Sequence, residues 1–241
     1  MKKTIFLSLT LLLTITSVSA ENLNDSTNQI DSTFNSINDP FESINRKVFS
    51  FNKQVDNYGI KPIAIFYKNN TPKPIQSKVS NFVNYLETPI HAINFGLQGN
   101  TDKLSDTLGR FILNTLGLGI LDFATEANIP NHKTTFGETL GLWGVSEGPY
   151  IVLPILGGNS LRDTSSNLAF DSNYNLNNNF NNTLKYSSIG LKVIDTRKNL
   201  LNYDNLINEY SFDEYSFVKN AIINKKRNNI ENIKIENNSS Y

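Results

Sequence analysis

The stretch from Arg110 to Ala124 is the most apolar part of the chain after its N-terminus, and it constrains the fold most strongly. Its apolar side chains crowd onto most faces of a helix; they are Phe111, Ile112, Leu113, Leu116, Leu118, Ile120, Leu121 and Phe123. The stretch is too short and too broken to cross a bilayer, which takes roughly 20 predominantly apolar residues. It therefore forms either the centre of a helical core or an element that meets lipid without crossing it. The residues alone leave both possibilities open.

Residues 1–20 have the pattern of an export signal that is removed. A positively charged start and an apolar run precede Val18-Ser19-Ala20, whose small residues suit cleavage between Ala20 and Glu21. An uncleaved N-terminal anchor is the alternative, although the apolar run is shorter than a membrane span. Residues 21–38 are polar and are expected to form a flexible tether. The mature chain would then begin outside a bacterial cytoplasm.

Composition argues against several classes of function. The export signal holds two of the 22 basic residues, so the mature chain has slightly more acidic than basic residues and no nucleic-acid partner is expected. The chain contains no cysteine. Only His91 and His132 could supply imidazole, and no ligand spacing is present, so neither a zinc nor a haem site is expected. The sequence predicts no cofactor and no metal.

Apolar residues recur at helical spacing over much of the mature chain. The motif Asp39-Pro40-Phe41-Glu42 predicts a helix with Asp39 as its N-cap. An apolar stripe follows, and Gly59 is expected to end this helix. A second helix is expected to stop at Pro89, and a third to begin near Thr101.

The rest of the chain divides into a Gly/Pro-rich part and a helical part. Residues 136–160 carry many glycines and prolines and predict loops and short extended pieces. Two more helices are expected around 188–209 and 212–228. With no internal repeat, the sequence predicts one all-α domain over residues 39–228 with a Gly/Pro-rich insertion. A disordered tail is predicted at 229–241.

One catalytic motif is present by its letters. Gly144-Val145-Ser146-Glu147-Gly148 matches the nucleophile elbow of serine hydrolases. That motif needs a preceding strand, a following helix, and then an acid and a histidine, whereas both histidines of this chain precede Ser146. Glu138 and Glu147 are a conceivable acid–base pair, but nothing in the sequence fixes their separation. A secreted serine lipase or esterase that uses Ser146 is one alternative function.

The arginines offer another kind of chemistry. Those on expected helices or near the insertion are Arg46, Arg110, Arg162 and Arg197. A planar guanidinium binds a phosphate or a carboxylate through two parallel hydrogen bonds, where lysine offers a point charge. These side chains therefore either contact phospholipid headgroups or form ion pairs with carboxylates such as Asp39 and Asp163.

Several motifs follow one another along the chain in a fixed order. They are Asp39-Pro40-Phe41-Glu42-Ser43-Ile44-Asn45-Arg46, Phe51-Asn52, Leu86-Glu87-Thr88-Pro89, Arg110-Phe111-Ile112-Leu113-Asn114-Thr115 with Gly117 and Gly119, Gly148-Pro149-Tyr150, and Leu161-Arg162-Asp163. In these motifs the chain resembles the MlaA (VacJ) family of outer-membrane phospholipid-transport proteins. The resemblance runs from about Asp39 to Asp163, and more loosely as far as the last expected helix.

This resemblance implies a ring-like, membrane-embedded helical protein in the inner leaflet of a Gram-negative outer membrane, with an amphipathic channel and no enzymatic activity. It implies removal of mislocalised phospholipid from the outer leaflet and delivery to a periplasmic carrier, which maintains lipid asymmetry. The implied partners are phospholipid, a trimeric outer-membrane porin and a periplasmic lipid-carrier protein. The lipid-path or channel candidates are Asp39, Asn45, Arg46, Asn52, Arg110, Asn114, Gly117, Gly119, Gly148, Pro149, Tyr150 and Arg162.

One feature departs from the family pattern. Members usually carry a cysteine just after the apolar part of the signal, which becomes the lipid anchor, whereas Val18-Ser19-Ala20-Glu21 offers an ordinary cleavage site. Retention at the membrane would then depend on the helices or on the porin, and a partly soluble periplasmic location is an alternative. The apolar stretch from Arg110 would help to hold the protein in the leaflet, with Gly117 and Gly119 marking a bend. A periplasmic domain that only scaffolds a porin is a further alternative.

Overall fold

The computed structural model describes residues 37–171, 173, 175–204, 207 and 211–239. The predicted signal peptide and most of the predicted tether lie outside these residues. The chain divides into two compact units, Met1–Ile37 and Asn38–Tyr241. Every element below belongs to the second unit.

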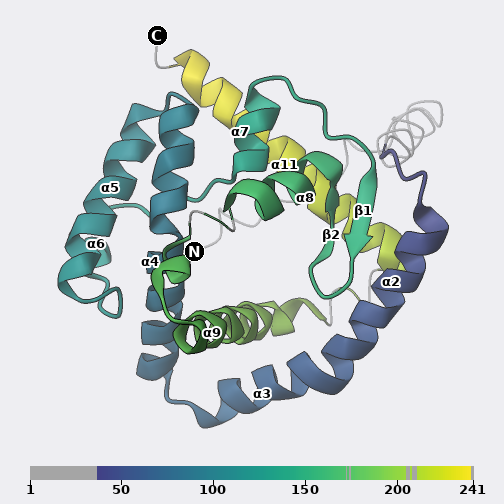
Figure 1. Ribbon diagram of the computed structural model, residues 1–241, viewed down its shortest axis with the longest axis horizontal. Coiled ribbons are helices and arrows are strands. Elements are labelled where there is room, and N and C mark those ends of the chain that lie inside the picture. Colours follow the sequence, from purple (N-terminus) through teal and green to yellow (C-terminus); the bar gives the residue numbers. More distant parts are fainter. Residues whose placement is uncertain (1–36, 172, 174, 205–206, 208–210, 240–241) are drawn as a thin grey trace, which may run out of the picture. The chain divides into compact units, whose positions relative to one another are not determined.

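The unit begins with a long helical segment (Figure 1). Helix α2 (Glu42–Val55) continues through a short π-helix, η1 (Asp56–Ile60), into α3 (Lys61–Asn70). The predicted end at Gly59 is wrong, since the chain stays helical there. A π-helical turn directly precedes Pro62, and this wider turn accommodates a residue that has no backbone N–H.

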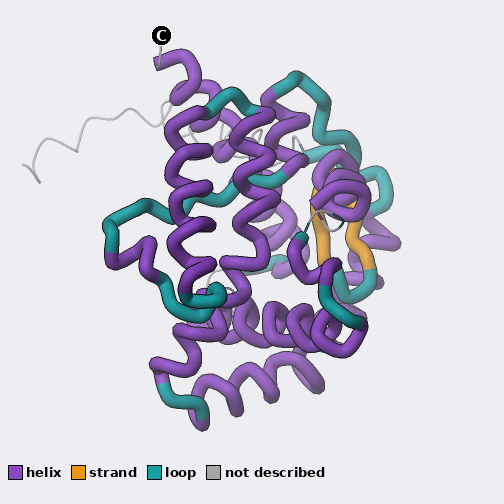
Figure 2. The backbone as a smooth tube through the Cα atoms, turned by 60° about the vertical axis from the view of Figure 1, so that its left-hand side comes forward, coloured by secondary structure: helices purple, strands orange, loops and turns teal. Residues whose placement is uncertain are grey.

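Helices α4 (Lys73–Leu97) and α5 (Thr101–Leu116) pack side by side (Figure 2). The predicted start of α5 is confirmed, and the Asn100 side chain caps it by accepting a backbone N–H at 3.0 Å. Helix α4 runs through Pro89, where the sequence predicted a stop. A proline inside a helix costs about 3 kcal/mol, and the packing of α4 along α5 offsets that cost.

The stretch from Arg110 to Ala124 does not form one helix. Helix α5 ends at Leu116, the chain turns, and the short helix α6 (Phe123–Glu126) follows. Leu118 and Gly119 both have positive φ, 54° and 73°, so the chain reverses direction sharply here. The bend that was predicted in this region is a full turn between two helices.

The Gly/Pro-rich part contains short elements. They are α7 (Phe136–Leu142), β1 (Tyr150–Leu153), β2 (Gly157–Ser160), α8 (Leu161–Ser166), η2 (Asn167–Asp171) and η3 (Leu176–Asn179). The strands form an antiparallel hairpin in which Tyr150 pairs with Ser160 and Leu153 with Gly157. Short extended pieces were predicted here, and the hairpin confirms them. The short helices at 136–142 and 161–166 were not predicted.

The C-terminal part contains α9 (Asn182–Leu200), the 3₁₀ turn η4 (Leu201–Tyr203) and α11 (Glu214–Ser239). Helix α11 continues well past the predicted end, so the prediction of a disordered tail is wrong for residues 229–239. Asparagine is a weak helix former, but Ile230 and Ile233 are buried against the rest of the unit. Tertiary packing of this kind supplies most of the stability of a helix in a protein.

The contacts between elements close into a circuit (Figure 1). Helix α2 packs against the hairpin, the hairpin against α11, α11 against α7, and α7 against α4. Helix α4 packs against α9, and α9 packs against α3, which continues α2. The predicted all-α class is confirmed, and this closed circuit agrees with the predicted ring-like arrangement.

Candidate functional site

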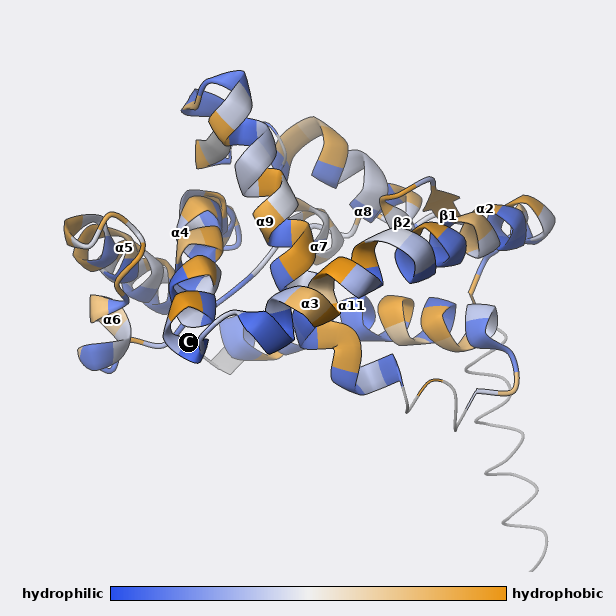
Figure 3. Cartoon of the chain, turned by 90° about the horizontal axis from the view of Figure 1, so that it is seen from below, coloured by the Kyte–Doolittle hydropathy of each residue, from blue (hydrophilic) through white to orange (hydrophobic). Residues whose placement is uncertain are grey.

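Polar and apolar side chains are distributed in an unusual way in the described part of the chain. Its buried polar residues include Asn45, Gln76, Asn94, Gln98, Arg110, Glu138, Arg162, Asp163, Asp195, Lys198 and Lys219. Large apolar side chains are exposed instead, among them Tyr58 (87%), Phe66 (69%) and Leu116 (75%). Figure 3 shows apolar bands along the surfaces of several helices. Soluble domains bury most such side chains and expose charged ones, so this distribution indicates an apolar environment outside the protein.

Two asparagines of α2 hold the open edge of β1. The Asn45 side chain donates to the carbonyl of Tyr150 at 2.9 Å and accepts from the N–H of Val152 at 2.9 Å. Asn52 repeats this pattern. Its side chain donates to the carbonyl of Leu153 at 2.9 Å and accepts from the N–H of Ile155 at 2.7 Å. The two asparagines are two helical turns apart and therefore share a face. The helix thus supplies the partners that a third strand would otherwise supply.

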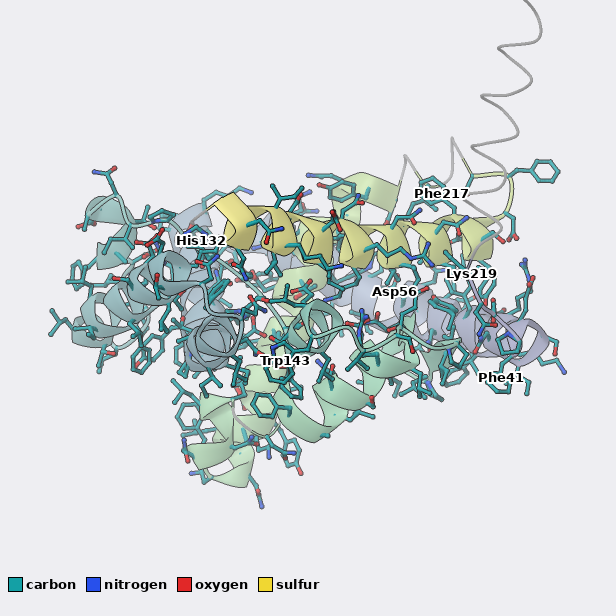
Figure 4. All side chains as sticks on the ribbon, turned by 90° about the horizontal axis from the view of Figure 1, so that it is seen from above. Phe41, Asp56, His132, Trp143, Phe217 and Lys219 are labelled. Atoms are coloured by element: carbon teal, nitrogen blue, oxygen red, sulfur yellow. The ribbon has the colours of Figure 1, made fainter. Side chains whose placement is uncertain are left out.

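Asp39 precedes α2 and forms an ion pair with Lys219 of α11, which Figure 4 labels. The carboxylate accepts hydrogen bonds from Asn45 at 2.8 Å, from the Tyr215 hydroxyl at 2.5 Å and from the Lys219 ammonium at 2.9 Å. Burial raises the pKa of Asp39, but these hydrogen bonds and the charge of Lys219 outweigh burial and hold the pKa below its usual value. The prediction that Asp39 caps α2 is wrong, because its carboxylate binds side chains at this junction instead.

Arg46 joins the same two helices. Its guanidinium donates to both carboxylate oxygens of Asp213, at 3.0 and 2.6 Å, and to Glu42 at 2.7 Å. It also lies 4.4 Å from the centre of the Tyr215 ring. Both side chains of the Arg46–Asp213 pair are about 40% exposed. The pair therefore stands at the partly solvated rim of the junction.

Arg110 anchors the corner between α5 and α6. One of its nitrogens donates to both carboxylate oxygens of Asp122, at 2.8 and 2.9 Å, and another donates to the carbonyl of Ile129 at 2.5 Å. Asn114 donates to the same carboxylate at 3.0 Å. The Arg110 side chain is only 9% exposed. Burial raises the pKa of Asp122, but hydrogen bonds from Thr125 and Asn114, together with the charge of Arg110, bring the pKa below its usual value.

The corner also presents leucines outward. Leu116 and Leu118 are 75% and 74% exposed on either side of the turn. Gly119 has positive φ, and a Cβ added there would lie 2.3 Å from a ring carbon of Tyr85, so this position requires glycine. A buried ion pair and a close backbone approach thus fix a turn whose leucines do not pack into a core.

A third cluster stands at the start of α8. Arg162 and Asp163 form an ion pair at 3.1 Å, with side chains 7% and 3% exposed, and Arg162 also donates to the carbonyl of Val145 at 3.1 Å. A Cβ on Gly137 would lie 2.1 Å from an Asp163 carboxylate oxygen, so α7 approaches α8 closely. Asp163 is one of the carboxylates named above as possible arginine partners, and Arg162 forms an ion pair with it.

Gly148, Pro149 and Tyr150 lead from the loop after α7 into β1. Gly148 has a φ of 68°, a left-handed conformation that favours glycine. The carbonyl of Pro149 accepts from the N–H of Leu161 at 2.9 Å. The Tyr150 side chain is buried, and burial raises the pKa of its hydroxyl to about 12. These three residues hold the hairpin against the start of α8.

The predicted site residues therefore gather into three clusters: the α2–hairpin–α11 junction, the α5–α6 corner and the start of α8. The hairpin links the first cluster to the third, because both Asn45 and the start of α8 bind the residues that lead into β1. The arginines form ion pairs in each of them, and Arg197 pairs likewise with Asp56 at 2.8 Å and Asp204 at 2.9 Å. Of the two interpretations of the arginines, this geometry favours ion pairs over direct headgroup contact.

Ser146 is exposed in the loop between α7 and β1. A helix precedes it and a strand follows, which is the reverse of the nucleophile-elbow order. The ring of His91 bonds to the carbonyl of Thr134 at 2.7 Å, and that of His132 to Asp106 at 3.0 Å. Among the described residues, neither histidine is hydrogen-bonded to Ser146.

Glu138 and Glu147 each bind α11. Glu138 is buried and accepts from Lys226 at 3.2 Å and from Asn229 at 2.7 Å, whereas Glu147 pairs with Arg227 at 3.0 Å. Burial raises the pKa of Glu138, but the charge of Lys226 and the hydrogen bonds outweigh it and lower the pKa. Each glutamate thus fixes a different point of α11, and this geometry does not join them as an acid–base pair.

A polar pocket of about 400 Å³, which was not predicted from the sequence, lies where α3, α4 and α9 meet. The residues that line it are Lys68, Lys73, Gln76, Ser77, Ser80, Asn81, Lys198, Asn199 and Asn202. A signal was present in the sequence, because Lys73, Gln76, Ser77 and Ser80 recur at helical spacing on one face of α4. The prediction used helical spacing to find apolar faces, and this polar face has the same period.

Membrane-spanning helices and metal clusters are both absent from the described part of the chain. No helix there has both the length and the apolar character that a membrane crossing requires. No group of histidine, aspartate and glutamate side chains there is arranged to hold a metal ion.

Comparison with known proteins places these features in a family. A family described as MlaA lipoprotein matches residues 37–229. An Escherichia coli K12 protein named intermembrane phospholipid transport system lipoprotein MlaA is 36% identical over 172 residues, which cover 69% of this chain and 68% of that protein. An uncharacterized Rickettsia felis protein is 35% identical over 168 residues, covering 68% of this chain. The chain spans about two thirds of the length of these relatives, 66% for the Rickettsia felis protein.

The fold has a solved counterpart. A structure described as the structural basis for maintenance of bacterial outer membrane lipid asymmetry superposes with a TM-score of 0.70 at 34% identity, covering 78% of this chain and 96% of that one. The family match extends over most of the described residues and includes all three clusters. The chain belongs to the MlaA lipoprotein family.

Proposed function

We propose that this chain works in intermembrane phospholipid transport. It lies in the periplasmic leaflet of a Gram-negative outer membrane and takes up phospholipid that has strayed into the outer leaflet. The lipid passes along the polar interior to a periplasmic carrier protein, and lipid asymmetry is maintained. The names of the E. coli relative and of the solved counterpart support this proposal.

The observation that carries the proposal is the inverted distribution of side chains. Large apolar residues are exposed along helices of the described part, none of which is suited to crossing a membrane, while many of the buried residues are polar. A protein that sits within one leaflet needs an apolar exterior of this kind. A phospholipid that moves past it needs a polar route for its headgroup, because an unsolvated charge in hydrocarbon is very costly.

The chain supplies no energy source for this movement. Its sequence contains no Gly-rich nucleotide-binding loop of the P-loop type. Direction then comes from differential affinity, in which the carrier binds the lipid more tightly than the exit from the polar interior does. The ring-shaped scaffold lowers the barrier, and the partner sets the direction.

The twelve predicted site residues act in this proposal by holding the route open. Asn45 and Asn52 fix the hairpin, Arg110 fixes the α5–α6 corner, and Arg162 fixes α8. Because these groups are hydrogen-bonded to the protein itself, they position the surfaces that meet the lipid. A trimeric porin would contact part of the apolar exterior and hold the protein in the outer membrane.

The first experiment is deletion of the chain followed by measurement of phospholipid in the outer leaflet. We expect outer-leaflet phospholipid to rise and to return to normal when the wild-type chain is restored. A deletion strain with an unchanged outer leaflet would overturn the proposal. Restoration by a Ser146→Ala chain distinguishes transport from a secreted lipase, which would lose its activity with that serine.

The second experiment tests the apolar exterior at the α5–α6 corner. The double variant Leu116→Ser, Leu118→Asn makes the turn polar, and asparagine tolerates the positive φ of position 118. We expect less of this variant in outer-membrane fractions and more phospholipid in the outer leaflet. Ile235→Ser, at an exposed position near the end of α11, is the control for loss of one exposed apolar residue.

A third experiment separates transport from scaffolding of a porin. A photo-crosslinking side chain placed beside Asn45, Arg46 or Asn114 would capture phospholipid during transport. A scaffold would give crosslinks to the porin but none to lipid, and that outcome would contradict the proposal.

A further inference from the structure

The polar pocket between α3, α4 and α9 lies outside the three clusters described above. It has a volume of about 400 Å³ and every residue that lines it is polar. Sites for small ligands start at a few hundred Å³. Three lysines, Lys68, Lys73 and Lys198, line the pocket and no acidic residue does.

The floor of the pocket is electrically neutral. Lys198, whose side chain is 10% exposed, donates to Asp195 at 2.6 Å, and Ser80 donates to both carboxylate oxygens of Asp195 at 2.8 and 2.9 Å. An ammonium has three N–H donors, and in the described part of the chain Lys198 uses one of them on Asp195. Lys198 therefore keeps donors for a ligand above it.

The rim of the pocket carries an excess of positive charge. In the described part of the chain, neither Lys68 nor Lys73 forms an ion pair, and Lys68 donates only to the neutral side chain of Asn202, at 3.1 Å. Gln76 fixes the corner between α3 and α4 by donating to the carbonyls of Lys68 at 3.0 Å and Thr71 at 2.7 Å. Two ammonium groups without an acidic partner among the described residues thus lie on adjacent helix ends.

This arrangement suits an anion with several oxygen acceptors. Lysines bind phosphate as point charges, and charge-assisted hydrogen bonds are about twice as strong as neutral ones. The amides of Asn81 and Asn199, which also line the pocket, add neutral donors. We propose that this pocket binds a phosphate-bearing group. The source is the headgroup of a phospholipid, an assignment that rests on the proposed function, or a free phosphate ester.

The test is a titration of the purified full-length chain in non-ionic detergent. The ligands are dihexanoyl phosphatidylglycerol, glycerol 3-phosphate and inorganic phosphate, and the readout is isothermal titration calorimetry. The pocket variant is Lys68→Gln, Lys73→Gln. The matched control is Lys47→Gln, Lys78→Gln, which removes the same charge from two exposed lysines outside the pocket. Thermal unfolding of both variants checks that each is folded.

We expect the wild-type chain and the control variant to bind alike and the pocket variant to bind more weakly. Each lost charge-assisted hydrogen bond is worth roughly tenfold in affinity, so the loss should exceed tenfold and shrink at high salt. Tighter binding of the lipid than of the two free phosphates identifies the headgroup as the source, and the reverse identifies a free phosphate. Equal weakening in both variants, or no binding of any ligand by the wild-type chain, would overturn the proposal.

The outcome for the pocket is independent of the outcome for transport. If the pocket fails in the titration while the deletion strain accumulates outer-leaflet phospholipid, the transport proposal stands and the pocket proposal falls. If the pocket binds phosphate and the deletion strain has a normal outer leaflet, the site stands and the transport proposal falls.

Discussion

Two corners of the molecule are each held by an arginine–aspartate pair with two hydrogen bonds, but they are built differently. At the α5–α6 corner, Arg110 and Asp122 are 12 residues apart in the chain and Arg110 is 9% exposed. At the α2–α11 junction, Arg46 and Asp213 are 167 residues apart and both are about 40% exposed. The first pair is local and partly buried, with Asp122 24% exposed, whereas the second is distant and more solvated.

The comparison shows that similar contacts carry different amounts of stability. A solvated pair gains little, because water screens it and competes for its hydrogen bonds. A buried pair leaves an uncompensated charge when one partner is lost, so its removal is costly. The α2–α11 junction therefore depends on its other contacts, chiefly Asn45 with the hairpin and Asp39 with Lys219.

The largest effect is expected from Asp122→Asn. This change leaves the Arg110 charge buried without its counter-ion and should lower the free energy of unfolding by about 3 kcal/mol. The matched change Asp213→Asn, at the solvated pair, should cost less than about 1 kcal/mol. Chemical denaturation of both variants in detergent measures the difference. Equal losses would mean that burial does not distinguish the two corners.

Glycine substitutions compare the α5–α6 corner with the helical segment that follows α2. Gly119→Ala forces a Cβ against Tyr85 at a positive φ, which should lower the free energy of unfolding by about 2 kcal/mol. Gly59→Ala, in the π-helix that follows α2, places its Cβ in open space. The free energy of unfolding of that variant should rise by about 0.5 kcal/mol, because alanine favours helix over glycine. Thermal unfolding gives the sign of each change. Destabilisation at both positions would contradict the conclusion that only Gly119 is sterically required.

Local parts of this fold were predictable from the sequence and distant contacts were not. The start of α5 follows from capping residues and helical spacing, and the turn at Gly119 from its glycines. The length of α11 was missed, because Ile230 and Ile233 are buried by residues remote in sequence. The continuation through Pro89 was missed because the packing of α4 along α5 offsets the cost of the proline.

The candidate site shows the same limit. The motifs identified Asn45, Asn52 and Arg110 as important, but the partners of Asn45 and Asn52 lie about 100 residues away in the hairpin. Arg110 finds Asp122 nearby, which spacing alone does not reveal. Residue type indicated what each side chain can bind, and the fold determined that it binds the protein itself.

A smaller effect is expected from the asparagines of α2. Asn45→Leu leaves the buried N–H of Val152 and the carbonyl of Tyr150 without these partners, and should cost about 2 kcal/mol. Asn52→Leu removes the same pattern closer to solvent, where water replaces the lost hydrogen bonds, so it should cost less. Denaturation of the two variants, with hydrogen exchange of the hairpin amides, checks the order. A larger cost at Asn52 would show that the exposed end of the hairpin carries the junction.

The smallest effect is expected from acidification at the α2–α11 junction. The folded pKa of Asp39 lies below its usual value, so the carboxylate stabilises the fold above its unfolded pKa of about 3.9 and loses that contribution as the pH falls through the folded pKa. Asp39→Asn should flatten the fall of melting temperature below about pH 5. The change is modest, because a protonated Asp39 can still accept from Tyr215 and Asn45 while only the charge pairing with Lys219 is lost. An unchanged pH profile in Asp39→Asn would mean that this junction, like the Arg46–Asp213 pair, gains little from its charges.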